Sequence, residues 1–217
     1  MAELSPLLAE AGILTVGLVD MGFTETPEEG AIEVFASFEA NAVAKARYFS
    51  ALTGCPCLAD DSGLCVDALG GGPGVRSRRF ASDIGIPLHE RTDEDAANND
   101  ALIDACWNSG WAPPWSANYV CAAAYSDGVR VVHAVGRTNG AILPERVGVG
   151  GFGYDPHFVS ADLGVTFAAA SRDAKARVSH RTRAFAELLS MLKEIIDRSP
   201  PVDEAVPSRY SRGSCGA

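Results

Sequence analysis

The stretch Cys57-Leu-Ala-Asp-Asp-Ser-Gly-Leu-Cys-Val-Asp-Ala68 is the part of the sequence from which the fold can be worked out. Its first three residues are typical of a buried strand that ends at Asp60, and residues 64–68 predict a second strand directly after it. The run Gly70-Gly-Gly-Pro-Gly74 then predicts a loop, because glycine and proline interrupt regular structure more strongly than other residues. The stretch therefore predicts two strands joined by a polar turn over residues 60–63.

Helical patterns lie on both sides of this stretch. Residues 36–53 repeat apolar side chains at helical spacing, and Gly54 is the type of residue that ends a helix. A second long helix is predicted from near Ser179 to about residue 197, and a short one over residues 2–11. Each long helix has one apolar face, as packing against a core requires.

Three further segments are predicted to form strands. Residues 13–19 alternate between apolar and other side chains, which is the period of a strand. Residues 119–125 and 129–135 flank Ser126-Asp127-Gly128, a combination that predicts a hairpin. Because strands and helices are mixed along the chain, the predicted fold class is α/β with a mixed sheet.

Length and composition indicate one globular domain. The chain has 217 residues, of which 47% are hydrophobic and 21% are charged, close to the average for soluble domains. From Ser199 onward the sequence is dominated by proline, serine, arginine and glycine. We therefore assign residues 1–198 to the domain and predict a disordered tail over residues 199–217.

The charge balance excludes several classes of partner. The formal net charge of −10 argues against a protein that binds nucleic acid through a basic face. No apolar run approaches the about 18 residues of a membrane span, and the N-terminus has acidic rather than basic residues, unlike a signal peptide. The six cysteines are scattered without a zinc pattern. These features predict a cytoplasmic protein that binds neither nucleic acid nor membranes.

The adjacent carboxylates of Asp60 and Asp61 form the first group that could carry chemistry. Charges at the end of a buried strand are normally paired or bound to a metal. Carboxylate oxygens suit Mg²⁺, which takes one or two carboxylates together with substrate phosphates. Asp-Asp-Ser-Gly is also a favourable turn sequence, so the tetrapeptide alone leaves both interpretations open.

A basic group before the last helix forms the second. With Ser179 as the N-cap, His180 and Arg181 would lie in the first helical turn, where free backbone N–H groups favour anions. Lys175 lies just before them in the sequence. Positive side chains at this end oppose the helix dipole, which indicates a bound anion. An exposed basic helix face would give the same pattern.

A glycine-rich segment, residues 150–156, forms the third. Its glycines would allow a close approach of the backbone, and Phe152 and Tyr154 could stack on a flat ring. Asp155 could accept hydrogen bonds from a ring or a sugar. A tight turn leading into a strand would explain the same residues. Residues 70–80 carry three arginines. They could form a flexible basic lip, that is, a loop that covers phosphates, or an ordinary exposed loop.

Taken together, these segments resemble the inosine triphosphate pyrophosphatases, enzymes that remove non-canonical purine nucleotides. The resemblance covers about residues 3–196, and the order and approximate spacing of its motifs fit as a set. The motifs are Ser37-Phe38-x-x-Asn41-Ala42-x-x-Lys45-Ala46, Ala59-Asp-Asp-Ser-Gly-Leu64, Leu69-Gly-Gly-x-Pro-Gly74 with Ser77 and Arg79, Gly151-Phe-Gly-Tyr-Asp-Pro156 with Phe158, and Lys175 followed by Ser179-His-Arg181.

The resemblance implies a fold and a reaction. Members of the family have an elongated mixed sheet flanked by helices, with a cleft between two lobes, and usually form homodimers. They hydrolyse ITP, dITP and XTP to the monophosphate and pyrophosphate with Mg²⁺. For this chain the implied activity is therefore that of a nucleoside-triphosphate pyrophosphatase, acting in the sanitation of the nucleotide pool.

The resemblance also implies roles for individual residues. Asp61 is the expected base, and Glu33, Asp60 and Asp61 are the expected metal ligands; Glu28 and Glu29 are alternatives to Glu33. The remaining expected contacts are with the substrate. Those residues are Asn41, Lys45, Ser62, Arg79, Phe152, Gly153, Tyr154, Asp155, Lys175, His180 and Arg181.

The chain departs from the family pattern at its start. The family opens with a strand and a Ser/Thr-x-Asn-x-x-Lys loop that grips the triphosphate, and the sequence given begins in what would be the following helix. Two other functions therefore remain open at this stage. One is a nucleotide-binding relative without turnover, and the other is a general Mg²⁺-dependent nucleotide phosphatase.

Overall fold

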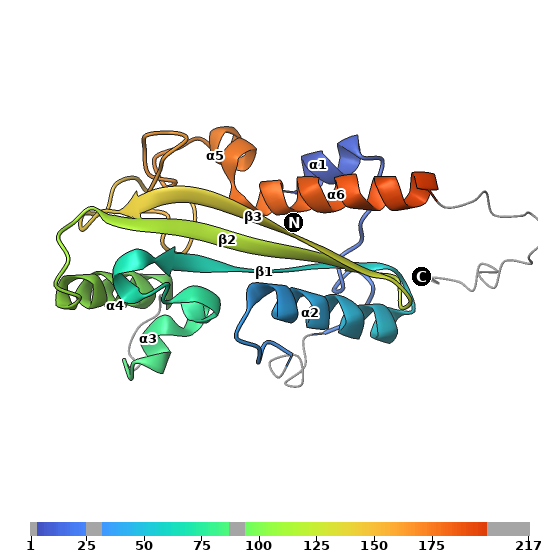
Figure 1. Cartoon of the computed structure of the whole chain (residues 1–217), viewed down its shortest axis with the longest axis horizontal. Coiled ribbons are helices and arrows are strands. Elements are labelled where there is room, and N and C mark those ends of the chain that lie inside the picture. The colour runs from blue at the N-terminus through green and yellow to red at the C-terminus, as the bar shows by residue number, and fades with distance from the viewer. Residues whose placement is uncertain (1–3, 25–31, 87–93, 199–217) are drawn as a thin grey trace, which may run out of the picture.

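The computed structural model describes residues 4–24, 32–86 and 94–198, and an antiparallel sheet is its centre (Figure 1). The sheet has the order β1-β2-β3-β4. Its strands are β1 (Cys57–Val66), β2 (Trp115–Ser126), β3 (Val131–Ile142) and β4 (Phe158–Ser160). The α/β class is confirmed, although every strand pairing within the described residues is antiparallel rather than mixed.

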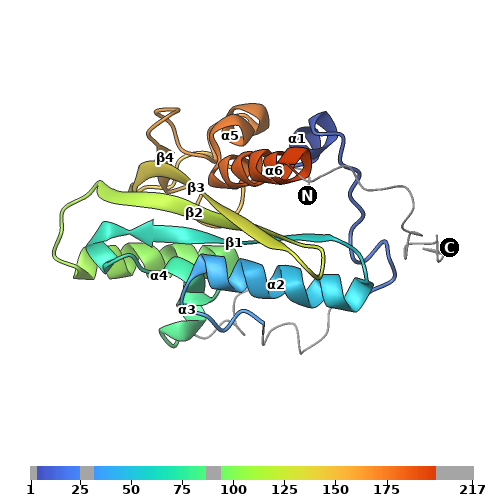
Figure 2. The same cartoon turned by 45° about the vertical axis from the view of Figure 1, so that its right-hand side comes forward.

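Helices cover both faces of this sheet. Figure 1 and Figure 2 show α2 and α4 below the strands, and α1, α5 and α6 above them. The α-helices are α1 (Ser5–Glu10), α2 (Phe38–Thr53), α3 (Phe80–Asp83), α4 (Glu94–Asn108), α5 (Arg172–Val178) and α6 (His180–Arg198). Two short 3₁₀ segments, Asp67–Leu69 and Gly74–Arg79, connect β1 to α3.

Alternation along β2 divides the core between the two faces. Val120 and Ala122 pack with α2, whereas Cys121 and Ala123 pack with α6. Side chains of successive strand residues point to opposite faces, so one strand can line two cores. The small alanines let both helices approach the sheet closely.

The strand β1 is continuous, which corrects the expected turn over residues 60–63. It pairs with β2 without interruption from Cys57 opposite Ser126 to Val66 opposite Ala117. The ladder to β2 satisfies the backbone of residues that would favour a turn in isolation. Gly63 is needed here for a close contact, because a Cβ atom there would overlap the carbonyl oxygen of Gly74.

Most of the other expected elements are confirmed, and one is wrong. The helices predicted over residues 2–11, 36–53 and 179–197 are present as α1, α2 and α6, and the hairpin is that of β2 and β3. Residues 13–19 do not form a strand, and Leu14 is almost fully exposed. Alternation alone cannot make a strand without a neighbour to pair with.

Two further sequence predictions concern the C-terminal tail and membrane-spanning segments. The tail predicted over residues 199–217 lies outside the described residues. Among the helices of the described residues, none has the length and apolarity needed to cross a bilayer.

Gly136 on β3 sets how closely α6 packs on the sheet. A Cβ atom at this position would overlap the carbonyl oxygen of His180 and the amide nitrogen of Ala184. Both atoms belong to helix backbone and cannot move without shifting the helix. Because His180 begins α6, this one glycine also fixes where the first turn of that helix lies.

We predict that Gly136→Ala lowers the free energy of unfolding by at least about 2 kcal/mol, because overpacking against backbone displaces α6. Chemical denaturation would measure the change. The neighbouring substitution Arg137→Ala is the control, since it alters an exposed side chain on the same strand and should cost less than about 0.5 kcal/mol. Equal stabilities of Gly136→Ala and the wild type would contradict the close contact.

Candidate functional site

The side chain of Asp61 lies on the α2 face of the sheet within a group of polar residues. Asn41 Nδ2 donates to Asp61 Oδ2 at 2.9 Å, and Lys45 Nζ lies 3.5 Å from Asp61 Oδ1. Lys45 Nζ also contacts Glu33 Oε1 at 2.9 Å, and Arg79 Nη2 lies 3.9 Å from Glu33 Oε2. The structure thus brings together five residues that the sequence analysis assigned to metal and substrate.

Asn41 connects this group to the segment in front of α2. Its side chain accepts a hydrogen bond from the backbone N–H of Phe35 at 2.9 Å and donates to the carbonyl oxygen of Phe35 at 3.2 Å. The same amide donates to Asp61, and the side chain is almost fully buried. Asn41 therefore fixes both the carboxylate and the segment that carries Glu33.

Opposing effects act on the pKa of Asp61. Burial raises the pKa above its ordinary value, and this effect is larger than the lowering by the Asn41 hydrogen bond and by the charge of Lys45. The nearby Glu33 carboxylate raises it further. A carboxylate with a raised pKa accepts a proton more readily than an ordinary one, which suits a general base.

The donor set around Asp61 fits a hard divalent cation. Glu33 and Asp61 supply two carboxylates that both contact the Lys45 ammonium group, so a positive charge is already accommodated between them. Within the described residues no group of three or more His, Cys, Asp or Glu side chains could hold a metal by itself. Two carboxylates completed by water and phosphate oxygens are the usual protein environment of Mg²⁺. Glu28 and Glu29, the alternatives to Glu33, lie outside the described residues.

Asp60 lies on the opposite face of the sheet from Asp61. It is opposite Ala123, which packs with α6, whereas Asp61 is opposite Ala122, which packs with α2. Asp60 Oδ2 accepts a hydrogen bond from Arg181 Nε at 3.0 Å. The structure therefore does not bring Asp60 together with Glu33 and Asp61, as the expected set of three metal ligands requires, because strand alternation separates neighbouring residues.

The glycine-rich segment places an exposed ring beside a buried ion pair. Asp155 accepts a hydrogen bond from the backbone N–H of Phe152 at 2.9 Å and forms an ion pair with Lys175. The Lys175 ammonium lies 4.5 Å from the centre of the Phe152 ring, and Phe152 is 58% exposed. The hydroxyl of Tyr154 points inward and donates to the carbonyl oxygen of Ser77 at 2.7 Å. Phe152 is thus available to a flat ligand, whereas Tyr154 anchors the segment.

His180 is buried and uncharged at neutral pH. Its ring stacks on Tyr119 with centroids 4.8 Å apart and an interplanar angle of 10°. Burial lowers the pKa of His180 to about 3, with smaller contributions from the positive charges of Arg181 and Lys175. Its Nδ1 has no hydrogen-bond partner within the described part of the chain. A neutral imidazole can either donate or accept a hydrogen bond, depending on its tautomer.

Sequence reasoning missed two residues that hold the glycine-rich segment. Asp95 Oδ2 accepts a hydrogen bond from the Gly153 N–H at 2.6 Å, and Asn99 Nδ2 donates to the Gly153 carbonyl oxygen at 2.8 Å. Both residues lie on α4, four positions apart and therefore on one face of the helix. The spacing of Asp95 and Asn99 can be seen in the sequence. Their contact with Gly153, 54 positions after Asn99, cannot.

The arginines of residues 70–80 do not form a single basic lip. Arg76 is paired with Asp83 at the surface, and Arg79 lies near Glu33. Of these arginines, Arg79 therefore has the contact that links it to the Asp61 group.

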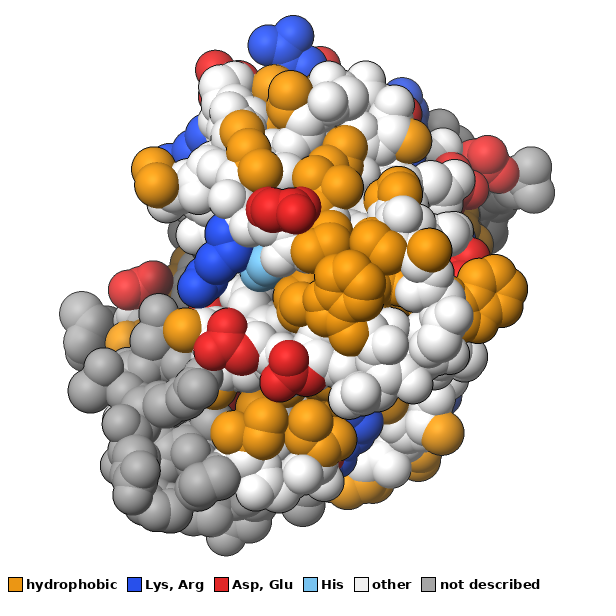
Figure 3. Space-filling model, turned by 90° about the vertical axis from the view of Figure 1, so that its left-hand side faces the viewer, with side chains coloured by type: hydrophobic (Ala, Val, Ile, Leu, Met, Phe, Trp, Pro, Cys, Tyr) orange, Lys and Arg blue, Asp and Glu red, His pale blue; other side chains and the backbone are white. Residues whose placement is uncertain are grey.

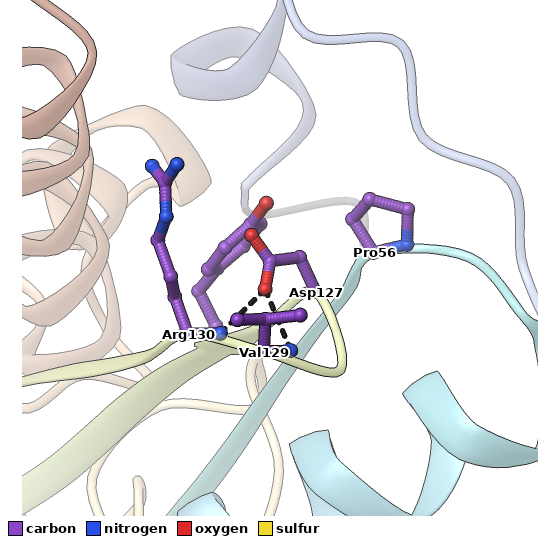
Figure 4. Close-up of a pocket in the computed structure, with 5 residues that line it drawn as sticks. Pro56, Asp127, Val129 and Arg130 are labelled. Carbon is purple, nitrogen blue, oxygen red and sulfur yellow. Dashed lines mark hydrogen bonds between the residues drawn. The ribbon is translucent and has the colours of Figure 1, made fainter. Parts of the chain in front are cut away.

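An open pocket of about 490 Å³ lies elsewhere, at the β2–β3 hairpin (Figure 4). It is lined by Pro56, Tyr125, Asp127, Val129 and Arg130. Figure 4 shows Asp127 accepting hydrogen bonds from the backbone of Val129 and Arg130, at 3.0 and 2.6 Å. These are bonds within the turn, so the pocket adds no residue to the groups described above.

Comparison with known proteins points to one family. The model of the Ham1 family matches residues 1–191. A protein named dITP/XTP pyrophosphatase from Ralstonia nicotianae is 42% identical over 196 residues, covering 89% of this chain and 91% of the relative. A protein of the same name from Nocardia farcinica is 42% identical over 205 residues, covering 92% of each.

Solved structures agree with these sequences. A HAM1 protein from Coxiella burnetii superposes with a TM-score of 0.75 at 30% identity, covering 89% of this chain and 92% of that one. A structure titled nucleoside-triphosphatase / dITP/XTP pyrophosphatase from Mycobacterium abscessus has a TM-score of 0.64 at 39% identity, covering 88% and 93%.

The buried His180 predicts a loss of stability in acid. Its pKa is about 3 in the folded state and near 6.5 in the unfolded chain, so the unfolded state binds more protons between these values. The free energy of unfolding therefore falls as the pH drops below 6.5, with a His180 contribution of about 2 kcal/mol by pH 4.5.

We predict that His180→Gln flattens the decline of stability between pH 6.5 and 4.5, as measured by denaturation at a series of pH values. Part of the decline should remain, because burial also lowers the pKa of His157. His133→Gln, which changes an exposed histidine, is the control and should leave the slope as it is. A wild-type slope in the His180 variant would mean that His180 is not buried in its neutral form.

Proposed function

This chain belongs to the Ham1 family, and we therefore propose that it hydrolyses the non-canonical purine nucleoside triphosphates ITP, dITP and XTP to the monophosphate and pyrophosphate. The observation that carries the proposal is the buried Asp61 carboxylate held beside Lys45, Asn41 and Glu33. Relatives about 40% identical over nearly their whole length bear the name dITP/XTP pyrophosphatase. The proposed role is removal of damaged nucleotides from the pool.

The proposed reaction is attack of water on the α-phosphorus, with pyrophosphate as the leaving group. Asp61 orients the water and accepts its proton, a role for which its position beside Asn41 and Lys45 is suited. Asn41 keeps the carboxylate in place through its hydrogen bond. Lys45 and Arg79 lie on the same side and offset the charge that develops on the leaving group.

Mg²⁺ is part of this proposal, with Glu33 and Asp61 as the residues that would hold it. When bound, such an ion neutralises phosphate charge and polarises the phosphorus that is attacked. The Lys45 ammonium contacts both carboxylates and would lie beside the phosphates of a bound nucleotide.

Recognition of the base is assigned to the other group of residues. The exposed Phe152 ring offers a flat apolar surface on which a purine can stack. Lys175 lies against Phe152 and Asp155, which supports a role at the base. A 6-oxo purine presents an acceptor where adenine has an amino group. Donation from His180 or Arg181 would therefore favour ITP and XTP over ATP.

We also propose that the protein forms a homodimer and that it is located in the cytoplasm. Figure 3 shows apolar side chains gathered at the end of the molecule where α4 leads into β2. Trp107 in the last turn of α4 is 52% exposed, and Trp111 in the connection that follows is 70% exposed. Large exposed aromatic residues are enriched in protein interfaces, which supports a second copy as the partner of this end.

We predict that the protein releases pyrophosphate, and little orthophosphate, from dITP in the presence of Mg²⁺, and that dATP is a much poorer substrate. Separate assays for the two products distinguish the proposed activity from its alternatives. Orthophosphate release with little preference for the base would indicate a general nucleotide phosphatase. Binding of dITP without either product would indicate a nucleotide-binding protein without turnover.

We predict that Asp61→Asn lowers kcat for dITP by at least about 100-fold, because the amide cannot accept the proton. The melting temperature should fall by no more than a few degrees, since the amide keeps the shape of the side chain and removes a buried charge. Asp104→Asn on α4 changes an exposed carboxylate and is the control. Near-native turnover in Asp61→Asn would remove Asp61 from the chemistry.

A further inference from the structure

The neighbouring carboxylates of β1 serve two different groups of residues. Asp61 contacts Asn41 and Lys45 on the α2 face, and Asp60 contacts Arg181 from α6 on the other face. The sequence places both among the expected metal ligands and does not show that they face different helices. In the structure they are separated by the full thickness of the strand backbone.

Asp60 and Ser62 hold the guanidinium group of Arg181 at two points. Arg181 Nε donates to Asp60 Oδ2 at 3.0 Å, and Arg181 Nη2 donates to Ser62 Oγ at 3.1 Å. Ser62 Oγ in turn lies 3.4 Å from Asp60 Oδ2. Asp60 and Ser62 are two positions apart on β1, so their side chains lie on the same face. A planar guanidinium held through two of its nitrogens is fixed in orientation.

The same carboxylate oxygen has a third neighbour on β2. Cys121 Sγ lies 3.7 Å from Asp60 Oδ2, and Cys121 is fully buried between β2 and α6. The side chains of Asp60 and Arg181 are 25% and 24% exposed. The ion pair is therefore partly removed from water, where a charged hydrogen bond is worth more than at the surface.

Arg181 occupies the second position of α6, directly after the buried His180. The backbone of this turn is set by the close contact with Gly136. The orientation of the long Arg181 side chain is set separately, by Asp60 and Ser62. Backbone and guanidinium are thus fixed by two different strands, β3 and β1.

We propose that Asp60 is a positioning residue, which holds the Arg181 guanidinium ready for the purine base and so sets the preference among substrates, rather than a metal ligand. The inference rests on the proposed function, because it assigns Arg181 to the base. Without the Asp60 charge, Arg181 samples more rotamers and must be ordered by the substrate. The resulting loss of kcat/KM affects 6-oxo purine nucleotides, which accept a hydrogen bond from Arg181. Adenine nucleotides do not accept this hydrogen bond and are therefore affected less.

The test compares kcat and KM for dITP and dATP in wild type, Asp60→Asn, Arg181→Gln and the double variant. In Asp60→Asn we expect kcat/KM for dITP to fall about 10-fold, mainly through KM, with dATP changed less than about twofold. In the Arg181→Gln background, Asp60→Asn should add less than about a twofold change, because Asp60 acts through Arg181. The Mg²⁺ concentration for half-maximal rate should stay at the wild-type value. Asp104→Asn is the matched control.

Two results would overturn the proposal while leaving the enzyme's function intact. One is an unchanged ratio of dITP to dATP hydrolysis in Asp60→Asn; the other is a clear rise in its Mg²⁺ requirement, which would make Asp60 a metal ligand. If the wild type itself releases no pyrophosphate from dITP, the proposed function fails instead. Should Asp60→Asn melt far below the wild type, Ser62→Ala replaces it, since it removes the other anchor of Arg181. A wild-type ratio in Ser62→Ala would then overturn the proposal.

Discussion

The antiparallel pairing of β1 with β2 decides which helix each polar side chain of β1 faces. The ladder runs unbroken through Asp60, Asp61 and Ser62, and it forces successive side chains to opposite faces of the sheet. A shift of this register by one residue would exchange the two carboxylates between α2 and α6. The contacts of Asp61 with Asn41 and of Asp60 and Ser62 with Arg181 follow from this register.

Because helices pack closely on both faces of the sheet, the alternating side chains of β1 contact α2 on one face and α6 on the other. Alanines and cysteine on β2 leave little space between the sheet and the helices, so α2 and α6 bring Asn41 and Arg181 within hydrogen-bond distance of β1. Gly136 allows the first turn of α6 to touch β3. The sheet therefore carries the Asp61 group on its α2 face and the Arg181 group on its α6 face.

The charges of the site are balanced in pairs although the whole chain is acidic. Lys45 lies between Glu33 and Asp61, Lys175 pairs with Asp155, and Arg181 pairs with Asp60. Pairing keeps partly buried cations stable when no nucleotide is present, since an unpaired buried charge is costly. Under the proposed function, Lys45 would contact the triphosphate and Arg181 the base, although each is paired with a carboxylate in this structure.

The fold class, the main helices and the hairpin could be predicted from the sequence, because these depend on periodicity and on turn residues close together in the chain. The sequence also identified most of the residues of the site, through motifs such as Asp60-Asp-Ser-Gly63 and Ser179-His-Arg181. The three-dimensional structure was needed to show that residues 60–63 continue a strand, that Asp60 and Asp61 face different helices, and that Asp95 and Asn99 hold Gly153. The strand pairing, the Asp60–Arg181 contact and the two contacts of Gly153 all join residues 50 or more positions apart, and local patterns carry no information about such partners.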